Sequence, residues 1–265
     1  MSPRGQYALR QVGQALRAAG IVPGQTVLVH SSLMRLGTPG DCTAAELPAR
    51  ICAELRDAVG EDGTIVVPTF NFDFCRGSPY DPASTPSKGM GVLSEFVRRL
   101  PGARRSPHPM QSVAAIGPRA EEICARDTAS SFDPGGPFAT LVELEARGLL
   151  LGAPMQSFSL VHLVEERLEV PYRYWKTFSG PYGSPPSARS YRMYVRDLAI
   201  DPMLDLAPIE QLLARRGQLG GATAGAGWIR SFAVRDFLSV ALEHVARDPE
   251  WLLRRRSETC GEPHA

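Results

Sequence analysis

The sequence lacks long apolar runs and blocks of like charge. Among its 265 residues, 29 are Lys or Arg and 28 are Asp or Glu, which leaves a formal net charge of +1. No stretch approaches the length of a membrane-spanning helix, and the first residues, MSPRGQYALRQ, contain no apolar segment of the kind found in signal peptides. We therefore expect a cytoplasmic, globular protein that binds neither membranes nor nucleic acids.

Cysteine and histidine are too scattered to predict a disulfide framework or a metal site. The five cysteines form no C-x-x-C pair, and the five histidines are widely spread. Reduced thiols and no bound metal are expected. The phosphate-binding G-x-x-x-x-G-K-[ST] loop, the G-x-S-x-G elbow, the H-E-x-x-H pair and a strand-linked G-x-G-x-x-G are also missing, which argues against the enzyme classes that depend on them.

The nearest approach to a charge block is Arg254-Arg255-Arg256, at the end of a predicted C-terminal helix. Adjacent guanidinium groups of this kind can bind nucleic acid. Cations are also favoured at the C-terminal end of a helix, where they interact with its dipole. We favour this second interpretation, because the chain has no longer run of one charge.

Hydrophobic patterning predicts an α/β fold. Apolar residues at helical spacing between 6 and 19 predict a helix, and the β-branched run at 26–30 predicts a buried strand of a parallel sheet. A second helix is expected over 43–59, with Thr43 and Glu46 as a capping box, followed by a buried strand over 63–68. Strand, helix and strand in this order imply a sheet that is covered on both faces.

The rest of the chain continues this alternation within one domain, residues 1–265. Strands are expected at 112–116, 148–151 and 191–195, and helices at 91–100, 118–126, 139–146, 159–168, 208–216 and 233–246. The glycine-rich stretch 217–227 is assigned no strand. Two long loops, 71–88 and 171–190, are rich in Pro, Gly, Ser and aromatic residues. Loops of this length are usually functional.

Small hydroxyl residues follow the first buried strand, in the segment Val29-His30-Ser31-Ser32-Leu33. In open α/β sheets, ligands bind beyond the carboxyl ends of the strands. Serines at this point leave room for a substrate and offer hydroxyl and backbone N–H donors, but they can equally serve to turn the chain. Spacing alone leaves both interpretations open.

A histidine and a carboxylate share one face of the helix expected at 159–168. His162 and Glu165 stand at positions i and i+3. A carboxylate beside an imidazole fixes its tautomer and raises its basicity, which suits a general base near neutral pH. Without further information, a histidine that is simply satisfied in the core or at the surface is the more frequent explanation of such a pair.

Two further segments have features of anion-binding sites. Arg104-Arg105-Ser106 combines two guanidinium groups with a hydroxyl, which suits phosphate groups. The segment 81–91 precedes a predicted helix N-terminus, where an anion can bind. A solvated loop and an ordinary capped turn explain the two segments equally well.

The order of these motifs along the chain resembles the aminoglycoside 3-N-acetyltransferase family. The matching segments are VHSSL at 29–33, GTIVVPTF at 63–70, DPASTPSKGMG at 81–91, RRSPHP at 104–109, LLLGAP at 149–154 and SLVHLVE at 159–165. The segments GQLG at 217–220 and SFAVRDF at 231–237 are similar to the family's C-terminal part. No single motif is decisive, but six in register along nearly the whole chain are specific.

The resemblance implies a three-layer α/β/α sandwich with a mostly parallel central sheet, distinct from the GNAT acetyltransferases, and acetyl-CoA as the donor. It makes His162 the catalytic base and Glu165 the residue that orients it, in a direct transfer without an acyl-enzyme. It places a further set of residues near the cofactor: Ser31, Ser32, Leu33, Arg105 and Ser106, with Thr85 and Ser112 as weaker candidates.

The segment after the predicted catalytic helix departs from what a polycationic substrate needs. An enzyme that binds aminoglycosides should line its acceptor cleft with carboxylates. Here the segment is aromatic and basic, and Gly136 stands where family members often have Ser. We therefore expect an anionic or neutral small-molecule amine, such as an amino sugar on a nucleotide carrier or an aminophosphonate. The residues expected at this acceptor site are His30, Tyr172, Arg173, Trp175 and Lys176, with Arg189 and Arg192 nearby.

Other functions stay open beside this one. The chain could acetylate aminoglycosides and confer antibiotic resistance, or it could be a non-catalytic CoA-binding relative. The intact pairing of His162 with Glu165 argues against the second alternative. A longer acyl donor, an oxygen acceptor and a homodimeric assembly are also compatible with these motifs.

Overall fold

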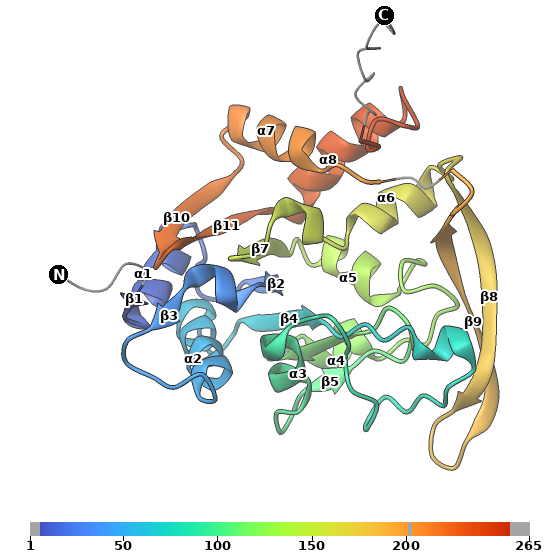
Figure 1. Cartoon of the computed structure of the whole chain (residues 1–265), viewed down its shortest axis with the longest axis horizontal. Helices are drawn as coiled ribbons and strands as arrows, with labels where there is room; N and C mark the ends of the chain where they lie inside the picture. The colour runs from blue at the N-terminus through green and yellow to red at the C-terminus, as the bar shows by residue number, and fades with distance from the viewer. Residues whose placement is uncertain (1–5, 201–202, 255–265) are drawn as a thin grey trace, which may run out of the picture.

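The computed structural model describes residues 6–200 and 203–254 (Figure 1). Its centre is a seven-stranded sheet. The strands follow one another in the order β10 (Gly220–Ala224), β11 (Gly227–Ala233), β7 (Arg147–Leu151), β2 (Thr26–Ser31), β4 (Thr64–Pro68), β6 (Val113–Ile116) and β5 (Arg104–Arg105). Two small sheets accompany it, one of β1 (Gln6–Tyr7) with β3 (Thr38–Pro39) and one of β8 (Arg173–Tyr182) with β9 (Ser187–Arg196).

The predicted α/β fold is confirmed, but the expected mostly parallel sheet needs a correction. Strand β2 runs parallel to both β4 and β7. The other pairs in the central sheet, β10 with β11, β11 with β7, β4 with β6 and β5 with β6, are antiparallel. The sheet is therefore mixed. A strand that is buried on both faces shows the same continuous apolar run in either direction, so its sequence does not reveal the direction of its neighbours.

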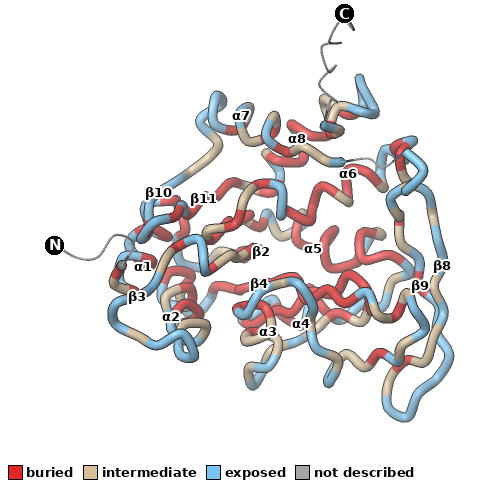
Figure 2. Tube along the Cα trace, viewed as in Figure 1, coloured by how far each residue is buried: buried red, intermediate tan, exposed pale blue. Residues whose placement is uncertain are grey.

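Helices cover both faces of the central sheet, as the three-layer architecture requires. Val27 and Val29 of β2 face α1 (Arg10–Ala18), α2 (Leu47–Val59) and α3 (Val92–Arg98). Leu28 faces the opposite layer, which consists of α4 (Ala120–Cys124), α5 (Pro137–Glu143), α6 (Val161–Arg167), α7 (Ala207–Arg215) and α8 (Val234–Val245). Figure 2 shows buried residues along the central strands and exposed residues on the outer side of the β8–β9 hairpin.

The helix signals in the sequence are largely reproduced. The Thr43 N–H donates to Glu46 Oε2 at 2.9 Å and the Glu46 N–H donates to Thr43 Oγ1 at 3.3 Å, which is the expected capping box. The regular turns of α2 begin only at Leu47. Helix α1 begins at Arg10 rather than at residue 6, because Tyr7 belongs to β1.

Two hairpins were missed by the sequence analysis. The loop expected at 171–190 is instead β8 and the first part of β9, which pair along ten residues each. The stretch expected to be irregular at 217–227 holds β10 and the start of β11. Glycine weakened the strand signal in both cases. In β10, glycine permits a close approach to α1, because a Cβ on Gly220 would lie 2.2 Å from the Ala19 carbonyl oxygen. The segment 71–88 does stay irregular apart from the short 3-10 helix η2 (Asp73–Arg76).

Three further expectations concern the chain ends, the thiols and membrane spans. Arg255, Arg256 and Cys260 lie outside the described residues. The remaining cysteines, Cys42, Cys52, Cys75 and Cys124, are free thiols. Within the described ranges, every helix is too short or too polar to cross a bilayer.

The close approach at Gly220 yields a matched pair of substitutions. Gly220→Ala should lower the free energy of unfolding by ~1–3 kcal/mol, because its Cβ would overlap the Ala19 carbonyl. Gly221→Ala should stay within ~1 kcal/mol, since its nearest neighbour would be the Ile229 oxygen at 3.7 Å. Urea unfolding midpoints of both variants measure the difference, and equal midpoints would contradict the packing of β10 on α1.

Candidate active site

His162 and Glu165 meet on the surface of α6, as their spacing predicted. The His162 Nδ1 lies 2.6 Å from Glu165 Oε2, and the Glu165 side chain is fully buried whereas that of His162 is 28% exposed. A carboxylate can only accept at this contact, so Nδ1 carries the proton of the hydrogen bond. In the neutral ring, the lone pair then sits on Nε2, the nitrogen turned away from Glu165.

A third side chain fixes the carboxylate from the other side. Arg173, at the start of β8, places its Nε 2.7 Å from Glu165 Oε1. Burial opposes ionisation of Glu165, but the hydrogen bond and charge of His162, together with the charge of Arg173, outweigh it and lower the pKa of Glu165 below its ordinary value. Glu165 is therefore ionised at neutral pH, and Arg173 serves it as a counter-ion.

A cavity of about 290 Å³ opens beside His162. Its wall is formed by the carboxyl ends of β2 and β4 (His30, Ser31 and Pro68), by Phe70, by Gly89 and Met90, by residues 156–159 with Val161 and His162, and by Leu204. The cavity thus lies where ligands bind in open α/β sheets, beyond the ends of two parallel strands. Among the described residues of this wall, only the two histidines carry a titratable side chain.

His30 lines this cavity and also supports it. Its Nε2 lies 2.8 Å from Ser159 Oγ and accepts the Ser159 backbone N–H at 3.2 Å. The ring packs against Phe158 with centroids 5.3 Å apart. Burial lowers the pKa of His30 to about 3, so the ring is neutral at physiological pH. His30 therefore lines the cavity and also holds the segment that leads into α6.

The residues expected near the cofactor fall into two groups. Ser31 lines the cavity, whereas Ser32 is half-buried and Leu33 is buried, both outside the cavity wall. Ser106 and Ser112 are fully buried: the Ser106 hydroxyl accepts the Val113 N–H at 2.9 Å, and the Ser112 hydroxyl donates to the Thr69 carbonyl at 3.0 Å. Both serines thus hold the edge of the sheet together, and their expected contact with the cofactor stays a prediction.

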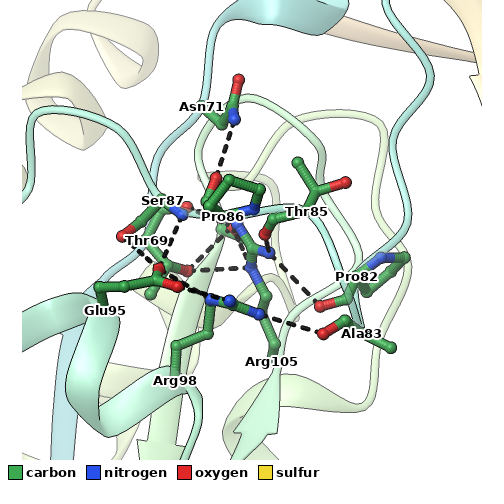
Figure 3. A network of polar contacts seen from close by, with 11 residues as sticks. Thr69, Asn71, Pro82, Ala83, Thr85, Pro86, Ser87, Glu95, Arg98 and Arg105 are labelled. Atoms are coloured by element: carbon green, nitrogen blue, oxygen red, sulfur yellow. Dashed lines mark hydrogen bonds and ion pairs between the residues drawn. The ribbon is translucent and has the colours of Figure 1, made fainter.

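Arg105 and Thr85 make hydrogen bonds within the protein (Figure 3). All three guanidinium nitrogens of Arg105 donate to oxygens of the protein, among them the Thr85 carbonyl. The Thr85 hydroxyl accepts the Asp81 N–H at 2.8 Å. Neither side chain belongs to the cavity wall. The sequence showed an arginine in a phosphate-binding type of pattern, but it could not show that the guanidinium points into the protein.

Of the residues expected at the acceptor site, His30 lines the cavity, whereas the other four lie on or next to β8, outside the cavity wall. Tyr172 is buried in the core, and its pKa is raised by burial and by the charge of Glu165. Trp175 is half-buried, with the Arg192 guanidinium 4.3 Å above its ring. Lys176 is exposed and lies over the Phe178 ring.

The basic charge of this region is largely neutralised, which corrects the expectation of free cations around the acceptor. Arg173 is paired with Glu165, Arg189 with Asp127 at 2.5 Å, and Arg192 with Asp133 at 2.8 Å. The sequence displayed the arginines as a cluster, whereas their acidic partners come from distant segments. These ion pairs remove the main reason to expect an anionic acceptor.

Several residues of the cavity wall were not singled out from the sequence. Phe70 and the Gly89–Met90 pair lie in motifs that were noted for other reasons. Gln156 reaches from η3 (Met155–Ser157) to the carbonyl of Leu204 at 2.9 Å and so brings that residue to the cavity. No pattern in the sequence marks Leu204, because its position depends on this long-range contact.

Comparison with known proteins identifies the family. Residues 28–246 match the family model described as aminoglycoside 3-N-acetyltransferase. The chain belongs to this family. Aminoglycoside N(3)-acetyltransferase IV from Salmonella sp is 31% identical over 249 residues, which cover 92% of this chain and 90% of that protein. Aminoglycoside N(3)-acetyltransferase III from Salmonella sp is 33% identical over 193 residues, and the chain spans 66% of its length.

Solved structures of aminoglycoside acetyltransferases share the fold, and with the family membership they confirm the expected enzyme class, an N-acetyltransferase. AAC(3)-IVa as the apoenzyme has a TM-score of 0.79 at 27% identity and covers 95% of this chain and 93% of that one. AAC-IIIb with CoASH has a TM-score of 0.80 at 25% identity and covers 91% and 97%. A mutant of AAC(3)-IVa in complex with apramycin has a TM-score of 0.75 at 27% identity and covers 94% and 96%.

The pairing of Glu165 with Arg173 predicts a change in acid stability. A carboxyl group whose folded-state pKa is lowered stabilises the fold above its unfolded pKa and loses this contribution as the pH falls through the folded pKa. Arg173→Met should raise the pKa of Glu165, cost ~3 kcal/mol at neutral pH because a buried charge loses a partner, and move acid unfolding to higher pH. Unfolding midpoints measured from pH 3 to 8 test this.

Arg192→Met provides the control on the same hairpin. Arg192 pairs with Asp133 through a side chain that is 44% exposed and does not touch Glu165, so its replacement should move the acid limb of the stability curve much less than Arg173→Met does. An acid limb that shifts equally in both variants would contradict the proposed pairing.

Proposed function

We propose that the protein transfers the acetyl group of acetyl-CoA to a primary amine of an amino sugar, with His162 as the general base. The observation that carries this proposal is the His162–Glu165–Arg173 arrangement, in which His162 lines a cavity of about 290 Å³. The CoASH held by AAC-IIIb supports a CoA thioester as the donor.

The tautomer of His162 suits this task. Glu165 accepts the Nδ1 proton, so Nε2 is free to take a proton from the attacking amine, directly or through a water molecule. The amine nitrogen forms a bond to the thioester carbonyl carbon, and the carbon–sulfur bond then breaks. The sulfur leaves as the thiol with a proton from the imidazolium, which returns His162 to its neutral form. Glu165 stabilises the imidazolium between these steps.

The acceptor class follows from the relatives and from the wall of the cavity. The relatives are named aminoglycoside acetyltransferases, and a mutant of AAC(3)-IVa is in complex with apramycin, which makes aminoglycosides the first class to consider. The described cavity wall contains no carboxylate, a feature that favours amino sugars of lower charge. We therefore propose an amino sugar as the acceptor. The test must include both polycationic aminoglycosides and amino sugars of lower charge.

Replacing the proposed base should abolish most of the turnover and spare donor binding. We expect His162→Ala to reduce kcat by about 10²-fold or more, because the amine proton has no positioned acceptor. CoA at a hundred times its Kd should still stabilise the variant by ~2.7 kcal/mol, as it should the wild type. Thiol release and thermal unfolding measure the two effects.

The assay compares acceptors of different charge with two histidine variants. Two classes of acceptor are offered to the enzyme in parallel: aminoglycosides, which carry several amines, and sugars that carry a single amine. His244→Ala is the control, since His244 lies on α8 outside the cavity wall and donates its Nδ1–H to the Val240 carbonyl at 2.9 Å. Full activity of His162→Ala would refute the role of His162, and a wild type that binds no CoA would refute the proposed function.

A further inference from the structure

The segment 82–91 reaches the cavity only at its end. Gly89 and Met90 form part of the cavity wall, and α3 begins directly afterwards at Val92. The segment has no regular secondary structure before that helix. The Lys88 N–H donates to the Phe70 carbonyl at 2.8 Å, and Asn71 donates to the Pro86 carbonyl at 2.8 Å. The position of this wall also depends on charged side chains that hold residues 82–88 against the rest of the protein.

Arg105 is the first of these fastenings (Figure 3). On one side, its Nη1 donates to the carbonyls of Pro82 at 3.3 Å and Thr85 at 2.5 Å. On the other side, its Nη2 donates to the Thr69 carbonyl at 2.7 Å, and its Nε donates to Ser112 Oγ at 3.0 Å. The guanidinium thus bridges the segment 82–88 and the end of the sheet, where β4 and β6 meet.

Glu95 and Arg98 of α3 form the second fastening (Figure 3). Glu95 Oε2 accepts both the backbone N–H and the hydroxyl of Ser87 at 2.9 Å. Arg98 donates to the Ala83 carbonyl at 3.1 Å and holds Glu95 through Nε at 2.9 Å. These contacts lower the pKa of Glu95 to about 2, with the hydrogen bond from Arg98 as the largest cause, so the pair stays charged.

We propose that Arg105 and the Glu95–Arg98 pair are positioning residues that hold the Gly89–Met90 wall in the shape that the CoA thioester needs. The inference rests on the proposed function and gives Arg105 a role other than a phosphate clamp. Arg105 acts through the segment it fastens, whereas Gly89 and Met90 are the residues of that region that line the cavity and would meet the ligand.

The chemistry of the site requires arginine at position 105. A guanidinium offers five N–H donors in a rigid fork, which matches oxygens on several sides at once. The oxygens around Arg105 are carbonyls and hydroxyls, and the ring of Tyr80 lies 5.1 Å from its guanidinium carbon. A lysine has one flexible ammonium and cannot bridge both sides. Arg105→Lys therefore keeps the charge and removes the fastening.

The experiment compares the binding of CoA and of dephospho-CoA, which lacks the 3′-phosphate, by calorimetry. We expect Arg105→Lys to weaken both ligands by about tenfold, equivalent to ~1.4 kcal/mol, with their affinity ratio unchanged. In turnover, KM for acetyl-CoA should rise by a similar factor while kcat at saturation changes much less. A selective loss of CoA over dephospho-CoA would overturn the proposal and show direct phosphate contact.

Two further variants separate positioning from general destabilisation. Arg104→Lys is the matched control, because Arg104 is 62% exposed and pairs with Glu121 at the surface, and its Kd values should equal those of the wild type. Arg98→Lys loosens the other fastening and should raise both Kd values together, which decides the question if Arg105→Lys does not fold.

Two remaining outcomes distinguish a failure of the positioning role from a failure of the proposed function. Variants at 105 and 98 that melt at lower temperature but bind CoA as tightly as the wild type would overturn the positioning role. A wild type that binds neither compound would overturn the proposed function itself, and the inference with it.

Discussion

A single buried carboxylate organises the candidate active site. Glu165 has no exposed surface and is held between His162 on its own helix and Arg173 on the following hairpin. An isolated buried charge is costly, so the two cationic or proton-donating partners are what make its ionised form stable. The ionised Glu165 in turn determines which nitrogen of His162 is free. The chemistry proposed for the cavity depends on this local arrangement.

The rest of the fold places ligand-binding surfaces around that imidazole. Parallel strands β2 and β4 end side by side and contribute His30, Ser31 and Pro68 to the cavity. Neutral, buried His30 holds the segment that leads into α6, and Arg105 holds the segment that leads to Gly89 and Met90. Both side chains looked like ligand contacts in the sequence. His30 lines the cavity and also supports its wall, whereas Arg105 lies outside the wall and contacts the segment that leads to it.

Local signals in the sequence predicted local features well. The apolar runs gave β2 and β4, the Thr43–Glu46 spacing gave the capping box, and the i, i+3 spacing brought His162 to Glu165. Features that depend on distant partners could not be read in this way. The arginines after α6 looked like free charge because their carboxylates come from other segments, and the glycines of β10 concealed a strand that packs closely on α1.

Nitrogen-15 NMR of His162 tests the central claim most directly. At a pH at which the ring is neutral, the account predicts that Nδ1 carries the proton and Nε2 the lone pair in the wild type, because Glu165 accepts from Nδ1. In Glu165→Gln this preference should weaken and the two tautomers should mix. A wild-type spectrum with the proton on Nε2 would contradict the assignment of His162 as the base that receives the amine proton.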